Sequence, residues 1–334
     1  MFNVLKKIIR FFIGLLPRRL ETAIYKMIFS VTKHRYHSYG EIQKYFPVNK
    51  NLSSTKEILF SHSGHLGDIL YSLYFCRELS AVYGMESFNF HIRTNVASPE
   101  LKNLKHPCCE VRITFESAKF LVGLLENQRY INRVSYGDEL PENAIDLDLF
   151  RKLPVNFSAG HIPDYYYDLV DKHLPRLFGE KIISVEPDYK YHDKIAVIAT
   201  CRYRNVFVDM GALKPFREHL VFVGLPEEYE DFCKKYFTLE YMNTGKSMHD
   251  IARCFSCIKG VIGNQSGLFA LAECMKIPRI LIAADFFELG GLVVAGPCNV
   301  IPQGGWCERV STTAKLVSVV KELVSCFENV TDIT

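Results

Sequence analysis

The chain has 334 residues, of which 48% are hydrophobic and 23% charged, so we expect a globular protein of about two domains. Its eleven cysteines are odd in number and scattered, which argues against a secreted disulfide framework and favours a reducing, cytosolic compartment. Residues 1–36 carry eight Lys and Arg against one acid, so this segment is +7 and the rest is −4 within a total of +3. A net acidic body argues against nucleic-acid binding.

The first 50 residues are predicted to form a basic amphipathic segment, in which bulky apolar residues alternate with cations. The longest apolar run, residues 11–17, is far shorter than the roughly 20 residues that span a bilayer. Pro17-Arg18-Arg19 follows it, where a signal peptide would have small residues. We expect the segment to lie on the anionic inner face of the plasma membrane, which makes the protein cytoplasmic and peripheral. The alternative is a helix packed on the protein's own body with its cations in solvent.

Strand and helix signals alternate from residue 56 onward. The first domain, residues 51–187, is expected to hold a strand at 56–61, a helix at about 68–83 and a strand at 88–92. The second domain, residues 188–334, has four short apolar runs separated by helix-length segments, at 194–200, 219–224, 260–263 and 279–283. Such runs indicate parallel sheets covered on both faces. The predicted fold is α/β, with two doubly wound Rossmann-like domains facing a cleft, and ligands are expected outside the carboxyl ends of the strands.

The turn after the first predicted strand contains Gly64, Gly67 and Asp68. Glycines allow the backbone to approach a ligand closely. Asp68 has two interpretations that are compatible with each other: a helix N-cap, which its spacing favours, or a general base that faces the cleft. His62, His65 and Gly67 are candidates for the acceptor side of the cleft. The turn is neither a Walker A motif nor GxGxxG.

A second glycine turn, Asn264-Gln265-Ser266-Gly267, follows the predicted strand at 260–263 and opens a helix. Backbone N–H groups at a helix N-terminus and the Ser266 hydroxyl are suited to hold a diphosphate. The alternative for Ser266 is a helix N-cap. Glu273, two turns into this helix, either accepts hydrogen bonds from a ribose or is a packing or solvent-facing carboxylate.

Further candidates follow other predicted strands. Arg202 and Arg204 come directly after residues 194–200 and suit bidentate phosphate recognition, although solvated arginines are an equal alternative. Gly224 ends the run at 219–224 and is assigned to the donor side. Asp148 and Arg151 belong to a stretch in which acids alternate with apolar residues, which predicts a strand edge whose polar face lines the cleft.

Three of these motifs resemble the ADP-heptose lipopolysaccharide heptosyltransferases, a group of GT-B glycosyltransferases (family 9-like). Residues 67–73 resemble the Gly-Asp turn near the start of that family. Residues 221–228 are similar to its apolar strand, glycine and acidic helix start, and residues 261–267 with Leu271-Ala272 to its donor-site turn and helix. The resemblance runs in the same order over roughly residues 56–325.

The resemblance implies a GT-B enzyme that transfers a sugar from a nucleotide-sugar donor to a glycan or lipid-linked acceptor in surface polysaccharide or lipopolysaccharide synthesis. Asp68 takes the place of the family's proposed catalytic base. The turn 264–267 would bind the donor, with Arg202 or Arg204 on its diphosphate. The reaction would be inverting and independent of metal and cofactor, because a helix dipole and cationic side chains replace a divalent ion. Cys254 and Cys257 form a lone CxxC, which predicts two helix thiols rather than a metal site.

This chain departs from the family's donor turn. The family usually has Asp-Thr-Gly followed by a histidine, whereas this chain has residues 264–267 with one extra residue and Phe269 near the place of the histidine. A nucleotide sugar other than ADP-heptose is therefore expected. The alternatives are a nucleotide-sugar epimerase of the same fold and a non-catalytic subunit that binds a nucleotide or glycan. A Rossmann dehydrogenase is disfavoured because GxGxxG is missing.

Overall fold

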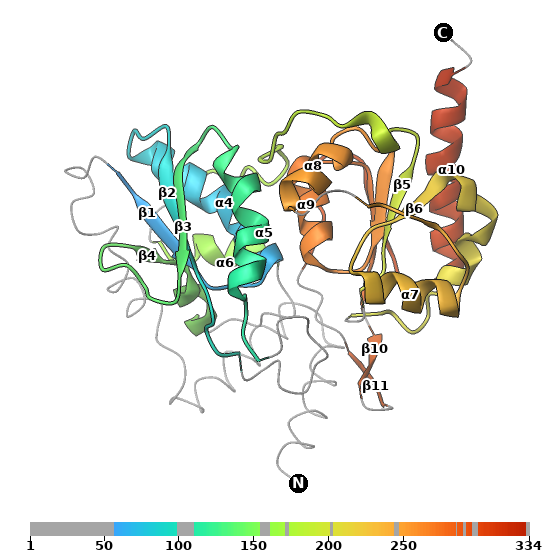
Figure 1. The fold of residues 1–334 in the computed structure, drawn as a ribbon, viewed down its shortest axis with the longest axis horizontal. Helices are drawn as coiled ribbons and strands as arrows, with labels where there is room; N and C mark the ends of the chain where they lie inside the picture. The colour runs from blue at the N-terminus through green and yellow to red at the C-terminus, as the bar shows by residue number, and fades with distance from the viewer. Residues whose placement is uncertain are drawn as a thin grey trace.

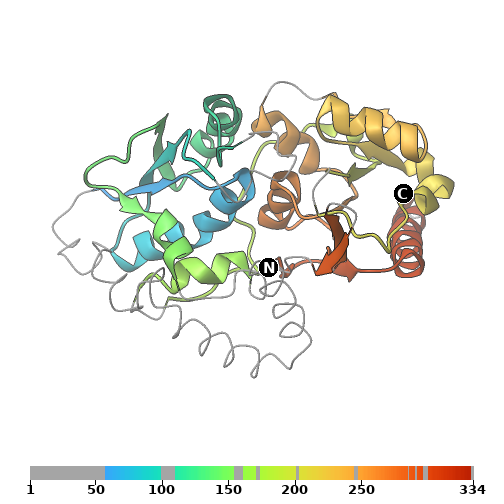
Figure 2. The same ribbon diagram turned by 90° about the horizontal axis from the view of Figure 1, so that it is seen from below.

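The structure is a computed structural model, which describes residues 57–98, 110–153, 161–170, 174–200, 203–243, 247–284, 286–289, 292–295 and 300–331. The predicted basic segment, residues 1–50, lies outside these ranges. Two parts, each with its own sheet, lie side by side in Figure 1, and the view from below in Figure 2 shows the same arrangement. The predicted α/β fold with two parallel sheets is confirmed.

The first domain contains a parallel sheet with the strand order β3-β2-β1-β4. Its elements are β1 (Leu59–His62), α4 (Leu66–Val82), β2 (Phe88–Arg93), α5 (Phe115–Glu126), β3 (Ile131–Gly137), β4 (Ile145–Asp146), the 3-10 helix η4 (Leu147–Lys152) and α6 (Ile162–Tyr167). The strand predicted at 56–61 is β1 and the strand predicted at 88–92 is β2. The helix predicted at about 68–83 begins two residues earlier, at Leu66.

The second domain contains a six-stranded parallel sheet with the order β12-β9-β8-β5-β6-β7. Its elements are η5 (Tyr189–Tyr191), β5 (Ile195–Ile198), η6 (Met210–His219), β6 (Leu220–Phe222), α7 (Pro226–Lys235), β7 (Glu240–Tyr241), α8 (Met248–Phe255), β8 (Gly260–Gly263), α9 (Gly267–Met275), β9 (Arg279–Ile282), β12 (Cys307–Val310) and α10 (Thr313–Thr331). β10 (Phe286–Leu289) and β11 (Leu292–Ala295) pair with each other as an antiparallel hairpin. The four predicted strands correspond to β5, β6, β8 and β9.

The second sheet is doubly wound, as its sequence predicts. Successive residues of a strand point to opposite faces, so β5 supplies two cores. Ile195 and Val197 pack with residues of η6, α7 and α10, whereas Ala196 and Ile198 pack with residues of α8 and α9. In the order of their appearance the six strands are arranged 3-2-1-4-5-6, the Rossmann order, and the direction of winding reverses between β5 and β8.

The two domains meet through helices. α4 lies against α9 and α5 against α8, and one continuous apolar cluster runs from the first domain to the facing side of the second sheet. Gly67 and Gly267 lie where α4 and α9 approach closely. A Cβ atom on Gly267 would lie 2.9 Å from the Cβ of Leu66, and one on Gly67 would lie 3.4 Å from the Cβ of Ala270. The N-termini of α4 and α9 are therefore in direct contact.

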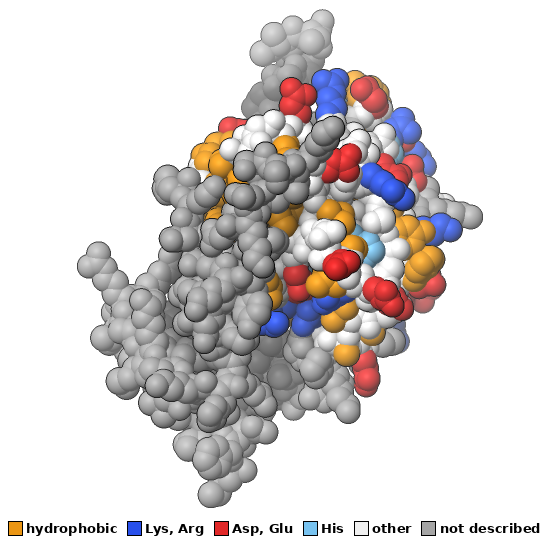
Figure 3. Space-filling model, turned by 90° about the vertical axis from the view of Figure 1, so that its left-hand side faces the viewer, with side chains coloured by type: hydrophobic (Ala, Val, Ile, Leu, Met, Phe, Trp, Pro, Cys, Tyr) orange, Lys and Arg blue, Asp and Glu red, His pale blue; other side chains and the backbone are white. Residues whose placement is uncertain are grey.

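The face of the first domain that Figure 3 shows has no predominance of one sign of charge among its coloured residues. On the part of the first domain that is coloured in Figure 3, acidic and basic side chains are interspersed with apolar ones, as is typical of a solvated surface. Among the helices that the structure describes, none is both long and apolar enough to cross a bilayer.

Candidate active site

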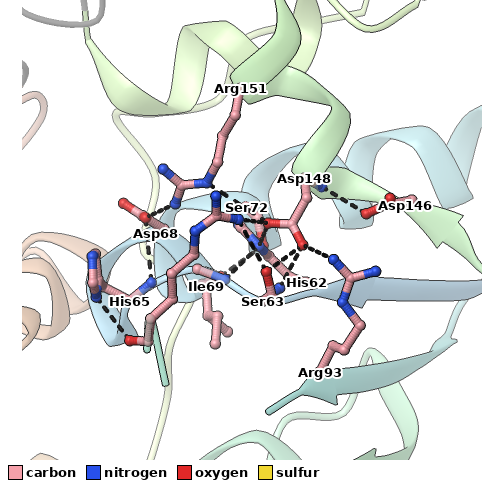
Figure 4. A network of polar contacts seen from close by, with 12 residues as sticks. His62, Ser63, His65, Asp68, Ile69, Ser72, Arg93, Asp146, Asp148 and Arg151 are labelled. Carbon is pink, nitrogen blue, oxygen red and sulfur yellow. Dashed lines mark hydrogen bonds and ion pairs between the residues drawn. The ribbon is translucent and has the colours of Figure 1, made fainter. Parts of the chain in front are cut away.

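The candidate site lies at the carboxyl ends of β1 and β4, where the winding of the first sheet reverses. In open parallel sheets this is the place at which ligands bind. β1 ends at His62, and β4 is followed by η4, which carries Asp148 and Arg151. β1 and β4 pair directly, with Ser61 opposite Asp146. Residues more than 80 positions apart are thereby brought into one polar network (Figure 4).

Asp148 is the most connected carboxylate of this network. Its Oδ2 accepts hydrogen bonds from the backbone N–H of Ser63 at 3.0 Å and from the Ser63 hydroxyl at 2.5 Å. His62 Nδ1 lies 3.1 Å from its Oδ1, and Arg93 donates to Oδ2 at 3.3 Å. Burial alone would raise the pKa of Asp148, but the contacts with His62 and Ser63 outweigh it and hold this pKa well below its ordinary value. Asp148 is therefore an anion near neutral pH and lies among cationic and hydrogen-bond-donating groups at the end of the sheet.

Asp68 lies in the first turn of α4, next to the contact between the domains. Its Oδ2 accepts the backbone N–H of His65 at 3.3 Å and also pairs with Arg151. The N-cap is His65, so Asp68 is the third helical residue and not the cap itself, which corrects the predicted helix start. Burial alone would raise the pKa of Asp68, but Arg151 and two neighbouring histidines outweigh it and hold this pKa below its ordinary value. Asp68 therefore both supports the helix start and is ionised.

Arg151 joins the two carboxylates. Figure 4 shows its side chain reaching from η4 into the space between Asp68 and Asp148. One Nη pairs with Asp68, while Nε lies 3.8 Å from Asp148 Oδ1. The guanidinium also lies over the ring of Phe150, at 4.7 Å from its centroid, and a quarter of the side chain is exposed. The predicted cleft residues Asp148 and Arg151 thus come together with Asp68, although they lie on a 3-10 helix and not on a strand edge.

His62 is fully buried and is linked to the backbone of Asp68 through Tyr166. Its Nε2 lies 2.7 Å from the Tyr166 hydroxyl, which in turn donates to the backbone carbonyl of Asp68 at 3.0 Å. Because Tyr166 uses its proton on that carbonyl, Nε2 of His62 is the donor to Tyr166. The assignment of His62 to the acceptor cleft is therefore corrected, since the side chain has no surface to offer. His65 is half-buried, and its Nδ1 donates to the carbonyl of Arg112 at 2.8 Å.

Four members of the network were missed in the sequence: Ser63, Arg93, Arg112 and Tyr166. Arg93 is the last residue of β2, the neighbour of β1, so its place at the carboxyl end of a predicted strand was an available signal. Arg112 lies 3.6 Å from Asp148 and 3.3 Å from the Ser63 hydroxyl, but it precedes α5 without any motif. Tyr166 belongs to α6, a short helix that carries no strong periodic pattern.

The turn between β8 and α9 lies at the second reversal point, between β5 and β8. Asn264 is buried there, and its side chain accepts the N–H of Thr200 at 3.1 Å and donates to the Thr200 carbonyl and hydroxyl. It therefore joins the ends of β5 and β8. Ser266 is the N-cap of α9 and accepts the N–H of Phe269 at 3.2 Å. Gln265 and Gly267 flank Ser266 at the start of the helix, so the turn presents a helix N-terminus to the first domain.

Several predicted donor residues have other partners. Glu273 is only 1% exposed and pairs with Arg279 and Lys276, so of its predicted roles the structure agrees with the packing carboxylate and not with the ribose contact. Arg204 donates to the Thr200 carbonyl and pairs with Asp231 at 2.8 Å, so its guanidinium is engaged within the second domain. Gly224 follows β6, and its carbonyl accepts the Tyr241 hydroxyl. Arg202 lies outside the described residues.

The contact between Gly67 and Gly267 joins the two halves of the site. A Cβ on Gly67 would lie 3.7 Å from the carbonyl oxygen of Ser266, and one on Gly267 would lie 3.7 Å from the backbone nitrogen of Gly67. Asp68 is therefore one residue away from the turn that opens α9. Within the described ranges, no group of three or more His, Cys, Asp or Glu is placed to hold a metal ion.

No family model matches the sequence, and no curated protein matches it either. Among solved structures, the chain is similar to a glycosyl transferase family 9 protein from Veillonella parvula, with 12% identity, 81% of this chain and 90% of that chain covered, and a TM-score of 0.47. It is similar to E. coli ADP-heptose lps heptosyltransferase II, with 13% identity, 81% and 99% covered, and a TM-score of 0.47. A third structure, E. coli heptosyltransferase WaaC with ADP, has 12% identity, 80% and 99% covered, and a TM-score of 0.43. All three scores are below 0.5, so the proposals for this chain rest on its own residues.

Proposed function

We propose that the chain is a GT-B glycosyltransferase that moves a sugar from a nucleotide-sugar donor to a hydroxyl of a glycan or lipid-linked acceptor. The observation that carries the proposal is the contact of Gly67 with the turn that opens α9, which places a helix N-terminus against the residue that precedes Asp68. A base and an anion-binding terminus in contact are the two parts that such a transfer needs. The motif resemblance at residues 67–73 and 261–267 supports the same reaction.

In this mechanism Asp68 accepts the proton of the acceptor hydroxyl. The acceptor oxygen then forms a bond to the anomeric carbon, while the bond from that carbon to the diphosphate oxygen breaks and the nucleoside diphosphate leaves. Attack opposite the leaving group inverts the anomeric centre. The N-terminal dipole of α9 and the nearby guanidinium of Arg151 stabilise the charge that develops on the diphosphate, so the proposal requires no divalent metal.

The experiment that tests the base is transfer by Asp68→Asn. The purified protein is first mixed with UDP, ADP, GDP and their sugars in the presence of EDTA, because a ligand that binds the native state raises the melting temperature. The donor found in this way is then offered with candidate acceptors and without any acceptor. We expect Asp68→Asn to lose at least about 100-fold in turnover, as is typical for a general base, while it still binds the nucleotide.

The matched control is Asp164→Asn, the same change at an exposed ion pair with Arg176, which should keep full activity. Retained turnover in Asp68→Asn would reject the assignment of the base. Product formed from the donor alone, without an acceptor, would identify an epimerase. A melting temperature unmoved by every nucleotide would reject the donor site.

We further propose that the enzyme acts on surface polysaccharide or lipopolysaccharide at the cytoplasmic face of the membrane. Residues 1–36, with a net charge of +7, support this location because each Lys or Arg near an anionic surface contributes about 1 kcal/mol. Flotation with phosphatidylglycerol vesicles is expected for the full chain at low salt and should fall as salt rises. Equal flotation after deletion of residues 1–50 would contradict it.

A further inference from the structure

The resting structure presents the proposed base in a form that is not ready to act. Asp68 Oδ2 is occupied by Arg151 and by the N–H of His65. A carboxylate that neutralises a guanidinium is a weak base, because a proton would have to displace the cation. If Asp68 takes a proton from an acceptor, Arg151 has to leave it first.

The charges around Asp68 show that Arg151 is the group that decides its state. Asp68 faces His62 at the end of β1 and His65 at the start of α4. The hydroxyl of Tyr166, on α6, donates a hydrogen bond to the backbone carbonyl of Asp68. The neighbouring part of α9 is the uncharged start of that helix, Ser266, Gly267 and Ala270. Arg151 makes the strongest of the attractions that lower the pKa of Asp68.

Arg151 can move away from Asp68 without leaving the second carboxylate, Asp148, without partners. Its other neighbour, Asp148, is 3.8 Å from Nε and is also held by His62, Ser63 and Arg93. Asp148 therefore stays compensated when Arg151 moves. A quarter of the Arg151 side chain is exposed and its guanidinium lies over the Phe150 ring, so the side chain can turn toward solvent without breaking a packed core.

A diphosphate at the start of α9 is the anion placed to attract Arg151. The turn that opens α9 contacts Gly67, the residue before Asp68. A diphosphate carries more negative charge than a carboxylate, and the planar fork of arginine matches phosphate oxygens in bidentate fashion. The anion and Asp68 therefore compete for the same guanidinium.

We propose that Arg151 is a latch that holds Asp68 in an ion pair until the diphosphate of the bound donor draws it away. This inference rests on the proposed function. It makes the base available only after the donor has bound, so the reaction is ordered. Once Arg151 has moved, burial is the largest remaining influence on Asp68 and raises its pKa toward the range in which a base is effective.

The test is a double-mutant cycle on the binding of UDP and of ADP, measured by calorimetry with wild type, Asp68→Asn, Arg151→Gln and the double variant. Asp68→Asn should tighten binding, because it frees Arg151 for the diphosphate and removes a negative charge. The loss of the Asp68 charge acts whether residue 151 is Arg or Gln, whereas release of the latch requires Arg151. We therefore expect Asp68→Asn to tighten nucleotide binding by a factor that is at least about fivefold larger with Arg151 than with Arg151→Gln.

The matched control is Arg93→Gln, which removes a guanidinium from Asp148 but not from Asp68. Its cycle with Asp68→Asn should be additive. A second measurement follows the Asp68 carboxyl by carbon NMR of Asp-labelled protein, with Asp68→Asn to assign the signal. Its titration should move to higher pH in Arg151→Gln, and in wild type saturated with the nucleotide, and stay in place in Arg93→Gln. A purely structural ion pair would give the shift in Arg151→Gln but not the response to the nucleotide.

Additive effects of Asp68→Asn and Arg151→Gln would overturn the latch and leave the proposed function intact. Failure of every variant to bind either nucleotide would overturn the donor site and the latch together, so the two failures are distinct. Should Arg151→Gln not fold, Arg151→Lys keeps the charge without the planar fork, and the same cycle with it should show a smaller coupling. Additive effects of Asp68→Asn and Arg151→Lys on nucleotide binding would then overturn the proposal.

Discussion

At the scale of single residues, Asp148 is the side chain that holds the other members of the candidate site in place. It is 7% exposed and contacts His62, Ser63 and three arginines. Removing one partner of a buried charge cluster leaves the others uncompensated, which costs about 3 kcal/mol or more. We expect Asp148→Asn to lose about that much stability at pH 7, measured by chemical denaturation.

The pH dependence gives this prediction a sign. Asp148 has a lowered pKa in the folded state, so it stabilises the fold above the unfolded value of about 3.9, and this stabilisation is lost as pH falls through the folded value. Stability of the wild type should therefore fall below about pH 5 more steeply than that of Asp148→Asn. Asp231→Asn, at an exposed pair, should change stability by at most about 1 kcal/mol. Parallel pH curves for wild type and Asp148→Asn would contradict the role of Asp148.

The sequence was sufficient to find some site residues and insufficient for others, for physical reasons. Asp68 follows a recognisable strand, and Asp148 and Arg151 belong to a stretch whose alternation of acids and apolar residues predicted a strand edge, so the rule that ligands bind at carboxyl ends of strands brings them together. For Glu273 the sequence left a ribose contact and a packing carboxylate open, because its partner Arg279 begins the next strand and no helical spacing predicts that contact, although Lys276 lies only three residues further along the chain. Tyr166 and His62 are 104 positions apart in the sequence, so no local sequence pattern predicts their contact.

At the scale of elements, the starts of α4 and α9 form the contact that brings the site together. Their close approach depends on Gly267, where an added Cβ would lie 2.9 Å from Leu66. Ala is the better helix former, so without this contact Gly267→Ala would stabilise by about 0.5–1 kcal/mol. With it, we expect a loss of about 1–3 kcal/mol and weaker binding of UDP or ADP, because the helices must separate.

Gly123→Ala is the matched control, since Gly123 lies within α5 and an added Cβ would meet no atom within 4 Å. It should be neutral or slightly stabilising and leave nucleotide binding unchanged. The two variants are compared by denaturation and calorimetry under the same conditions. Equal behaviour of both would show that the two helix starts are not in contact in solution.

Most of the fold was predictable because buried parallel strands are short apolar runs. β8 was predicted with its observed ends, 260–263, and β5, β6 and β9 within three residues. β4 and β7 were missed because each has two residues, too few for any pattern, and β3 and β12 were not singled out either. α4 was placed two residues late because the glycine turn hides its start, and its even apolar distribution reflects burial by both the first sheet and α9.

At the scale of the whole molecule, the continuous core decides how the two domains behave. Phe75 of α4, Leu124 of α5, Phe255 of α8 and Phe269 of α9 are all buried in one apolar cluster. The chain between the sheets is bound to it as well, since the N–H groups of residues 182 and 183 donate to the carbonyl of Cys274. A large apolar interface opposes independent domain motion.

We therefore expect the protein to unfold in one cooperative transition, with equal calorimetric and van't Hoff enthalpies. Phe269→Ala, which removes a fully buried ring beside the interface, should destabilise by about 3–5 kcal/mol and shift that single transition as a whole. Phe207→Ala removes a ring that is 59% exposed and should leave it in place. Two resolved transitions, only one of them moved by Phe269→Ala, would mean that each domain has its own core, and that the contact of α4 with α9 follows from folding and does not drive it.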